Sequence, residues 1–530
     1  APGPDGLPAS TYKVCNYAGL RILYDCYLQF SEGREVPDDF LAAMMVFIAK
    51  SEPAVDGQPN LSLPSGVRPL SLSECSTKLI TTAVTDKLND VAVSSTDWRQ
   101  RGFVPGRVIT DNICEIEAGA AAVEMLGLDD SGVLLTDFGA AFPSILQAWI
   151  LHVLTRIGLP PWIILFLTGL YKPCEVLLKY KGRLWAGFEV LRGIRQGCPS
   201  SGAIFALATD PLFRYLAARA CRPCNMMRAY ADDLAFVIRS LARALPRLIA
   251  AFELLDKCAG LVLKLPKCVV IMIGDMSRVR FDAICDSCGG LWREVKCTRR
   301  AIYLGAMIGP EANDVKWDRP LKRFIGAVAR VRAPQLGYAR TTVLYNRHAA
   351  PTLSYIAQMT KPSLKALATV REYLQLLTSA PRNAVTPHTL SNMRDLGFNI
   401  EPSNFVLVST AAKVRLEVKT GIASKLDRFF TRFRERENVR LFYDAPNSWP
   451  EWYYGSAHFA IKEAMTIAEG TFDIGRLRDN DGVPRPNVQR TVYNELRKAS
   501  SPAVTLDKIK TQFLHWAGHI ADVHFDPLPG

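Results

Sequence analysis

The chain has 530 residues, of which 49% are hydrophobic, enough for two or more domains with sizeable cores. Lys and Arg number 64 against 51 Asp and Glu, which gives a formal net charge of +13. An excess of this size favours a polyanionic partner, nucleic acid before membrane, and a generic basic protein is the alternative. No stretch approaches the ~20 apolar residues that a membrane-spanning helix needs. The thirteen Cys are scattered through apolar segments, which favours a reducing compartment over a disulfide framework.

The first seventy residues predict a helix followed by two strands. The chain has no initiator Met and enters the turn Pro4-Asp5-Gly6 abruptly, so we expect a piece of a longer polypeptide. Apolar spacing predicts an amphipathic helix over residues 10–30 and strands over residues 44–50 and 67–72. These strands carry Lys50 and Arg68 at neighbouring ends. Two such cations can grip a triphosphate, whereas the alternative is a pair of solvated surface charges.

A buried strand with a carboxylate at its exit is predicted over residues 133–138. Behind this strand, Ser144 and Gln147 match a capping box, and the apolar spacing that follows predicts a helix ending at Gly158. Asp137 therefore lies where a core strand turns into a helix.

Residues 191–202 form a Gly-rich entrance to another predicted helix. Glycines let the backbone approach a ligand closely, and Arg195 and Gln196 supply hydrogen-bond donors at that approach. A simple loop is the alternative. The segment is not a P-loop, because the Gly-Lys-Ser/Thr ending is missing.

The pair Asp232-Asp233 organises the rest of the sequence. Residues 226–230 and the apolar run 234–238 can pair antiparallel, which places the two carboxylates at a hairpin tip. Adjacent acids there repel each other and lose hydration, so divalent cations are the expected occupants, with an ordinary solvated turn as the alternative. Beside Asp137 in one sheet they would form a three-carboxylate cup. Two metal ions about 4 Å apart in such a cup can activate a 3′-hydroxyl and steady a leaving pyrophosphate.

With these residues in place, the chain resembles the reverse transcriptases, and most closely those of non-LTR, target-primed retrotransposons. Eight motifs in that family's order carry the resemblance: Pro2-Gly3-Pro4-Asp5-Gly6, Arg68-Pro69-Leu70-Ser71, Gly102-Phe103, Thr136-Asp137-Phe138 with Ala141-Phe142, Arg195-Gln196-Gly197-Cys198-Pro199, Tyr230-Ala231-Asp232-Asp233, Gly260-Leu261 with Lys267-Cys268, and Tyr303-Leu304-Gly305. The similarity covers about residues 1–310 well and the following region loosely. Any one motif is weak, so the order is the specific signal.

The resemblance implies an α+β fold of the right-hand polymerase kind. Fingers and palm would span residues 1–310, with an antiparallel sheet carrying the acids, a helical thumb-like region would span 311–385, and a mostly helical region of unknown role would span 386–530. It also implies Mg²⁺ as the cofactor, as two ions, with Mn²⁺ as the alternative. The metal ligands would be Asp137, Asp232, Asp233 and the backbone carbonyl of Phe138.

Further residues take roles by the same resemblance. Phe142 falls where an aromatic ring under the sugar excludes a ribose 2′-hydroxyl and so favours dNTPs. Lys50 and Arg68 match the residues that grip the triphosphate. The other matches are Gln196 and Gly197 for the nucleotide and template, Lys267 for protonation of pyrophosphate, and Tyr303, Leu304 and Gly305 for the primer grip.

Two positions depart from the family pattern. Residues 139–143 read Gly-Ala-Ala-Phe-Pro where many relatives have lysines and a second Asp, although Asp137 and Phe142 stay in place. Leu265 stands where the family often has Asn, which leaves the surroundings of Lys267 open.

The resemblance implies an RNA-directed DNA polymerase that extends a DNA primer with dNTPs on an RNA template, in the nucleus and without a membrane. Another enzymatic function, that of an RNA-dependent RNA polymerase or of a host-adopted reverse transcriptase, is an alternative. Phe142 argues against the use of ribonucleotides. A non-enzymatic alternative is a decayed copy that binds RNA but does not catalyse polymerisation. The three intact acids argue against decay, and the oligomeric state stays open.

Beyond residue 310 the sequence predicts mainly helices. A helix over residues 317–332 and its flank carry cations suited to phosphates, with a solvated helix surface as the alternative. These cations are Lys316, Arg319, Lys322, Arg323, Arg330 and Arg332.

Two cysteine pairs and three histidines have metal-like spacing. Cys221/Cys224 and Cys285/Cys288 are too far apart in sequence for a compact zinc ribbon, so we expect reduced structural cysteines. For the histidines, which are His515, His519 and His524, we expect packing or surface roles.

Overall fold

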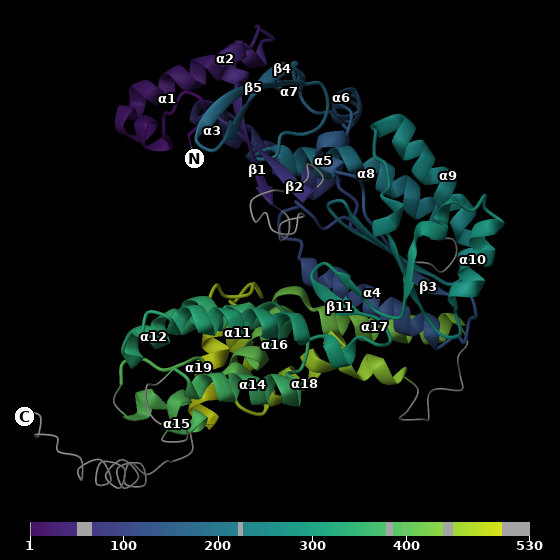
Figure 1. Cartoon of the computed structure of the whole chain (residues 1–530), viewed down its shortest axis with the longest axis vertical. Coiled ribbons are helices and arrows are strands. Elements are labelled where there is room, and N and C mark those ends of the chain that lie inside the picture. The colour runs from purple at the N-terminus through teal and green to yellow at the C-terminus, as the bar shows by residue number, and fades with distance from the viewer. Residues whose placement is uncertain are drawn as a thin grey trace, which may run out of the picture. The chain divides into compact units, whose positions relative to one another are not determined.

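The computed structural model describes residues 2–49, 66–220, 226–377, 385–396, 398–437 and 449–500. Several residues singled out from the sequence lie outside this range: Lys50, Cys221, Cys224, His515, His519 and His524. The chain divides into two compact units (Figure 1), residues 1–112 with 127–298, and residues 113–126 with 299–530. Helix α4 (Ile109–Glu124) begins in the first unit and continues in the second.

The first unit is built around a five-stranded sheet in the order β6-β7-β3-β8-β9. Strand β3 (Gly132–Thr136) is buried along its whole length and pairs antiparallel with β7 (Asp233–Ile238) and β8 (Val269–Met272). Strand β6 (Met226–Tyr230) forms a hairpin with β7, and β9 (Lys296–Thr298) lies parallel to β8. The strands predicted from the apolar runs are confirmed, because a strand covered on both faces needs apolar side chains at nearly every position.

Helices supply most of the remaining core of the first unit. Helix α9 buries Leu245, Leu248 and Leu255, whose spacing puts them on one face. That face joins Leu134 of β3 and Phe236 of β7 in one buried cluster. The helices of this unit, besides the start of α4, are α1 (Ala9–Ser31), α2 (Asp38–Leu41), α3 (Cys75–Ser95), α5 (Ala141–Ser144), α6 (Gln147–Arg156), α7 (Pro161–Leu170), α8 (Ser201–Ala220), α9 (Leu241–Ala259) and α10 (Arg278–Asp286).

A second sheet of the first unit has four strands in the order β2-β1-β4-β5. Strand β1 (Ala43–Ala49) pairs antiparallel with β2 (Val67–Ser73) and parallel with β4 (Cys174–Tyr180), and β4 forms a hairpin with β5 (Arg183–Val190). The two strands predicted to carry cations are therefore direct neighbours. Strand β5 lies at the edge of the sheet, and all its side chains are exposed or half-buried.

One local prediction, the capping box at Ser144 and Gln147, is wrong. Helix α6 begins at Gln147 with Leu146 at its N-cap, and no side chain caps it. The Ser144 hydroxyl instead donates to the carbonyl of Gly139 at 3.0 Å. Because that carbonyl lies at the entrance to α5, the serine stabilises the tight turn after β3 rather than the helix that follows.

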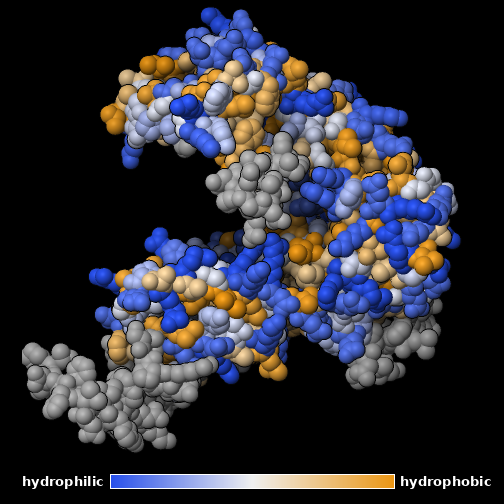
Figure 2. Space-filling view, in the orientation of Figure 1, coloured by the Kyte–Doolittle hydropathy of each residue, from blue (hydrophilic) through white to orange (hydrophobic). Residues whose placement is uncertain are grey.

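Helix α1 confirms the helix predicted over residues 10–30, with a kink that was not predicted. At Asn16 the backbone leaves the helical region, with φ 46° and ψ −128°. The outer face of the helix is apolar: Val14 is 83% exposed, Ile22 64% and Leu20 56%. Figure 2 shows hydrophobic surface over the region of this helix.

The second unit is mainly helical, as predicted beyond residue 310, and with the two sheets of the first unit this confirms an α+β fold. A short hairpin, β10 (Ala301–Tyr303) and β11 (Ala306–Ile308), precedes its helices. These helices are α11 (Asp318–Arg332), α12 (Tyr338–Leu344), α13 (Pro351–Ala357), α14 (Leu364–Gln375), α15 (Pro387–Ser391), α16 (Phe405–Thr420), α17 (Ile422–Glu437), α18 (Ala457–Glu469) and α19 (Val488–Ser500). A boundary near residue 385 stays a prediction, because the regions on both sides fall in one unit. In neither unit do the described residues include a helix with the length and hydropathy of a membrane span.

Lys316 is not one of the phosphate-facing cations that the sequence predicted. Its ammonium group lies 3.0 Å from Glu117 Oε1 and 3.2 Å from the carbonyl of Gly455, and both side chains of the ion pair are about 95% buried. A buried, fully paired charge fixes the partners that surround it, because breaking the pair would leave one charge without compensation. The other cations of this group, on helix α11, are exposed.

Candidate active site

The three predicted acids lie at one edge of the five-stranded sheet. Strands β3 and β7 run antiparallel in a register that places Asp137, directly after β3, at the same edge as Asp233, the first residue of β7. A two-residue turn of Ala231 and Asp232 joins β6 to β7, with Ala231 in the left-handed region at φ 55°. The predicted hairpin pairing is confirmed, whereas the catalytic role of the acids stays a prediction.

The crowding of the acids changes their protonation. Loss of hydration raises the pKa of Asp233 to about 6, and the charges of Asp232 and Asp137 add to the effect. Loss of hydration also raises the pKa of Asp232, with Asp137 contributing and nearby Arg68 counteracting it. Carboxylates that are costly to ionise without a partner favour a bound cation, because the cation restores the charged form.

The Asp137 carboxylate lies next to the ammonium group of Lys267. Lys267 Nζ lies 3.5 Å from Asp137 Oδ2, and both side chains are partly exposed. In the part of the chain that the structure describes, no three His, Cys, Asp or Glu side chains are gathered closely enough to hold a metal ion. A metal held by all three acids would therefore need their side chains to come closer together.

The backbone around Asp137 is anchored by the segment that precedes β8. The N–H of Lys264 donates to the carbonyl of Asp137, and the N–H of Gly139 donates to the carbonyl of Val262, both at 2.8 Å. This antiparallel pairing uses the groups on either side of Phe138 and neither of its own. The Phe138 carbonyl, predicted as a metal ligand, therefore faces away from the pairing segment.

Aromatic rings hold Phe142, the predicted sugar gate, from two sides. Its ring stacks on Phe205 with centroids 4.3 Å apart and planes 7° from parallel. Phe103 meets it edge-on at 5.6 Å, and Phe103 is itself 47% exposed. Because Phe205 is fully buried, the Phe142 ring rests on a rigid base and cannot retreat easily from a ligand above it.

The Gly-rich segment runs between the candidate site and strand β2. The N–H of Ser71 donates to the carbonyl of Gln196 at 2.7 Å, and the N–H of Ile194 donates to the carbonyl of Phe142, also at 2.7 Å. At Gly197 φ is 121°, and a Cβ atom would lie 2.4 Å from the Ser71 carbonyl oxygen, so only glycine fits there. Gln196 and Gly197 thus lie beside the strand that carries Arg68, whose charge acts on Asp232.

The predicted primer-grip residues belong to the second unit, where they form the turn of the β10–β11 hairpin. Leu304 and Gly305 have φ values of 48° and 86°, and the hydroxyl of Tyr355 donates to the Leu304 carbonyl at 2.6 Å. Tyr303 is buried. Their contact with a primer stays a prediction, as does the triphosphate role of Lys50, which lies outside the described residues.

A buried glutamine, to which the sequence assigned no role, holds the turn of the Asp-Asp hairpin. Gln100 is 1% exposed. Its Oε1 accepts the N–H of Ala231 at 2.9 Å and the N–H of Gly102 at 2.8 Å, while its Nε2 donates to the Ala231 carbonyl at 3.1 Å. One side chain therefore fixes both backbone groups of the left-handed residue. The only signal in the sequence is a polar residue before a glycine in a loop, and it does not reveal the partner.

The loop that carries Gln100 also braces strand β6. The N–H of Ala229 donates to the carbonyl of Arg99, and the carbonyl of Ala229 accepts the N–H of Arg101, both at 2.9 Å. Gly102 approaches so closely that a Cβ atom would lie 2.0 Å from the Ala231 nitrogen. The turn that presents the acids is therefore supported along its full length by residues about 130 positions earlier in the chain.

Comparison with known proteins identifies the domain. Residues 50–308 match the family described as "Reverse transcriptase (RNA-dependent DNA polymerase)". The "Transposon TX1 uncharacterized 149 kDa protein" of Xenopus laevis is 30% identical over 189 residues, 34% of this chain and 14% of that protein. The "Retrovirus-related Pol polyprotein from type-2 retrotransposable element R2DM" of Drosophila melanogaster is 27% identical over 280 residues, 52% of this chain and 25% of that protein. The alignments thus span about a quarter or less of these relatives.

Among solved structures, apo telomerase from Candida tropicalis, truncated from its C-terminal domain, matches with a TM-score of 0.37 and 12% sequence identity. The match covers 52% of this chain and 54% of that one.

Over residues 50–308 the chain is therefore similar to the reverse transcriptase domain, the class of RNA-dependent DNA polymerases. The two relatives are, by their names, proteins of a transposon and of a retrotransposable element. Enzymes of this family use divalent metal ions and a nucleic acid template and primer.

Replacing Gln100 with Ala is expected to lower the rate of primer extension at least tenfold, equivalent to about 1.4 kcal/mol. The substitution leaves the N–H and the carbonyl of Ala231 without their partners, so the turn that presents the acids loses its fixed geometry. The effect should fall on kcat more than on KM, because the acids are displaced while the nucleotide surface is unchanged. Gln29→Ala, on the exposed side of α1, is the matched control. A folded Gln100→Ala protein with the wild-type kcat would contradict the role.

Asp233 is expected to make the metal-free chain less stable as the pH rises. Its pKa is about 6 when folded and near 3.8 when unfolded, so the folded state holds the proton more tightly and ionisation costs folding free energy between about pH 4 and 6. In EDTA, the melting temperature should fall across this window, and Asp233→Asn should reduce the fall and melt higher at pH 7. Asp275→Asn, on the exposed surface, serves as the control. An Asp233→Asn protein that melts below wild type at pH 7 would refute the assignment.

Proposed function

We propose that the chain copies RNA into DNA by joining the 3′-hydroxyl of a DNA primer to the α-phosphate of a dNTP, with two Mg²⁺ ions. The observation that carries the proposal is the shared sheet edge of Asp137 and the Asp232-Asp233 hairpin within a reverse transcriptase domain. The nucleus is the compartment proposed for this activity, on the resemblance alone.

The donor set fits hard divalent cations. Asp137, Asp232 and Asp233 would hold the ions together with the Phe138 carbonyl, because oxygen ligands suit Mg²⁺ and Mn²⁺ and the raised pKa values leave the carboxylates in need of a positive partner. When bound, the ions supply Lewis-acid activation of the primer hydroxyl and stabilise charge on the phosphates.

The cations of the chain would handle the remaining phosphate charge. Arg68 lies close enough to the acids to affect Asp232, which suits a residue that grips the triphosphate of the incoming nucleotide, with Lys50 as its expected companion. Lys267 neutralises Asp137 in the metal-free chain. Lys267 would hold the leaving pyrophosphate and protonate it, as the resemblance implies.

The nucleotide would bind between the hairpin and the Gly-rich segment. Phe142, fixed by Phe205 and Phe103, would lie under the sugar and exclude a 2′-hydroxyl. Gln196 and Gly197 would line the base and the template, since both lie beside strand β2. The turn at residues 303–305 would hold the primer end.

Primer extension tests the proposal directly. Wild-type protein, given a poly(rA) template, an oligo(dT) primer, dTTP and Mg²⁺, is expected to extend the primer. Asp232→Asn should reduce extension to background, because the carboxylate that holds the metal is absent, while template-primer binding and the melting temperature stay near those of wild type. Asp275→Asn should extend normally. If folded wild type binds template-primer and adds no nucleotide, the polymerase proposal fails and RNA binding without chemistry replaces it.

Phe142→Ala is expected to raise the use of UTP relative to dTTP at least tenfold, equivalent to about 1.4 kcal/mol. Removing the ring removes the clash with the 2′-hydroxyl, so the gain should appear in kcat/KM for UTP while dTTP is affected less. Competition between the two nucleotides on the same template-primer measures the ratio. Phe398→Ala, an exposed position in the second unit, is the matched control. An unchanged ratio in a folded Phe142→Ala protein would show that the ring is not the gate.

A further inference from the structure

The β4–β5 hairpin exposes an unusual number of aromatic side chains. Tyr180 is 55% exposed, Trp185 54% and Phe188 51%, and all three belong to one hairpin of the four-stranded sheet. Large aromatic rings are rarely left in water without a binding role when they are grouped. We call these three residues the aromatic platform.

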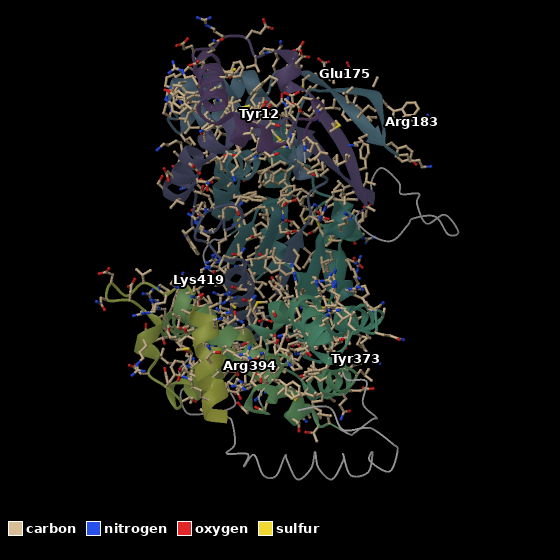
Figure 3. The ribbon with its side chains drawn as sticks, turned by 90° about the vertical axis from the view of Figure 1, so that its left-hand side faces the viewer. Tyr12, Glu175, Arg183, Tyr373, Arg394 and Lys419 are labelled. Carbon is tan, nitrogen blue, oxygen red and sulfur yellow. The ribbon has the colours of Figure 1, made fainter. Side chains whose placement is uncertain are left out.

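The platform residues share one face of the hairpin. Leu178 lies opposite Trp185, and Tyr180 lies opposite Arg183, so both pairs point to the same side of the sheet. Phe188 follows a register shift in the hairpin and lines a cavity together with Val176 of β4, which is on the same side as Leu178. Figure 3 shows Arg183 near the free end of the hairpin and Glu175 toward its other end.

The charges near the free end are positive. Lys181, in the turn, lies with its Nζ 5.5 Å from the centroid of the Tyr180 ring. Arg183 and Lys179 follow on either side of that turn, whereas the acidic pair of the hairpin, Glu175 and Glu189, lies at the far end. Rings flanked by cations at one end of a strand pair match the requirements of single-stranded nucleic acid, whose bases stack and whose phosphates are negative.

The platform continues into the candidate nucleotide site of the same unit. A cavity of about 440 Å³ is lined by Phe188 and Val176 of the hairpin and, at its other side, by Gln196 and by Pro143, which follows Phe142. The seven residues of β4 span roughly 20 Å. A strand that leaves the site over Gln196 can therefore reach the platform along this cavity, which passes over strand β1 of the sheet.

We propose that the aromatic platform binds unpaired RNA, namely the template strand before it reaches the site. The inference rests on the proposed function for the identity of the strand. Bases stack on Tyr180, Trp185 and Phe188, and Lys181 and Arg183 contact phosphates. The open edge of β5 could instead pair with a strand of another protein. The cations near the platform favour nucleic acid over a peptide.

Equilibrium binding of a fluorescent single-stranded RNA to the full chain tests the platform without catalysis. The double variant Tyr180→Ala/Trp185→Ala is expected to bind about tenfold more weakly or worse, because each substitution removes a stacking partner. Tyr17→Ala, an exposed tyrosine on α1, should bind like wild type. The variant Lys181→Gln/Arg183→Gln keeps the rings and should lower the slope of log K against log salt by about 0.7 for each phosphate that it no longer neutralises.

Primer extension separates this inference from the proposed function. On a template with a long unpaired 5′ region, the ring variant should extend with a KM raised about tenfold, whereas on a template that ends two nucleotides beyond the primer it should match wild type. If wild type extends primers and the ring variant binds RNA and copies long templates equally well, the platform proposal is overturned while the polymerase proposal stands. If neither wild type nor the ring variant extends a primer, the RNA-binding experiment alone still tests whether the platform binds RNA. Loss of self-association in the variant, with RNA binding unchanged, would assign the face to a protein strand instead.

Discussion

The register between strands β3 and β7 is the constraint on which the candidate site depends. Side chains alternate between the two faces of a strand, so a slip of one residue would move Leu134 and Phe236 from their shared cluster to the opposite face and would move Asp137 away from Asp233. The hydrophobic core therefore fixes the position of the acids. The acids themselves oppose this arrangement, since they repel one another, and the packing behind them is what holds them together.

The turn at Ala231 shows how a locally unfavourable backbone is stabilised. A left-handed conformation at a residue other than glycine costs on the order of 1–3 kcal/mol. Three hydrogen bonds of the buried Gln100, two of them to Ala231, offset that cost, and the close approach of Gly102 leaves the turn no room to move. The same loop carries Phe103 against Phe142, so one segment supports both the acid hairpin and the aromatic base of the site.

The two sheets of the first unit follow opposite patterns of burial. The five-stranded sheet hides β3 and most of β7 and presents carboxylates only at one edge, which suits chemistry that needs fixed geometry. The four-stranded sheet leaves β5 exposed along its length and places two of the rings, Tyr180 and Trp185, and the cations near its free end. Stacking on exposed rings tolerates any base, so such a surface suits a strand that must pass over it whatever its sequence.

Local sequence patterns predict the strands, the acids at their ends and the Asp232-Asp233 hairpin, and the order of the motifs indicates the resemblance to reverse transcriptases. These features depend on hydrophobic periodicity, turn-forming residues and residue type, all of which can be read from residues close together in the sequence. Which distant groups meet depends on the tertiary structure, which brings together Gln100 and Ala231 across 131 residues, Lys316 and Glu117 across 199, and Lys267 and Asp137. The tertiary structure also shows that Ser144 stabilises a turn, through its hydrogen bond to the Gly139 carbonyl, and does not cap a helix. A polar side chain selects its partner from whatever the fold brings within about 3 Å, and no local pattern reports that choice.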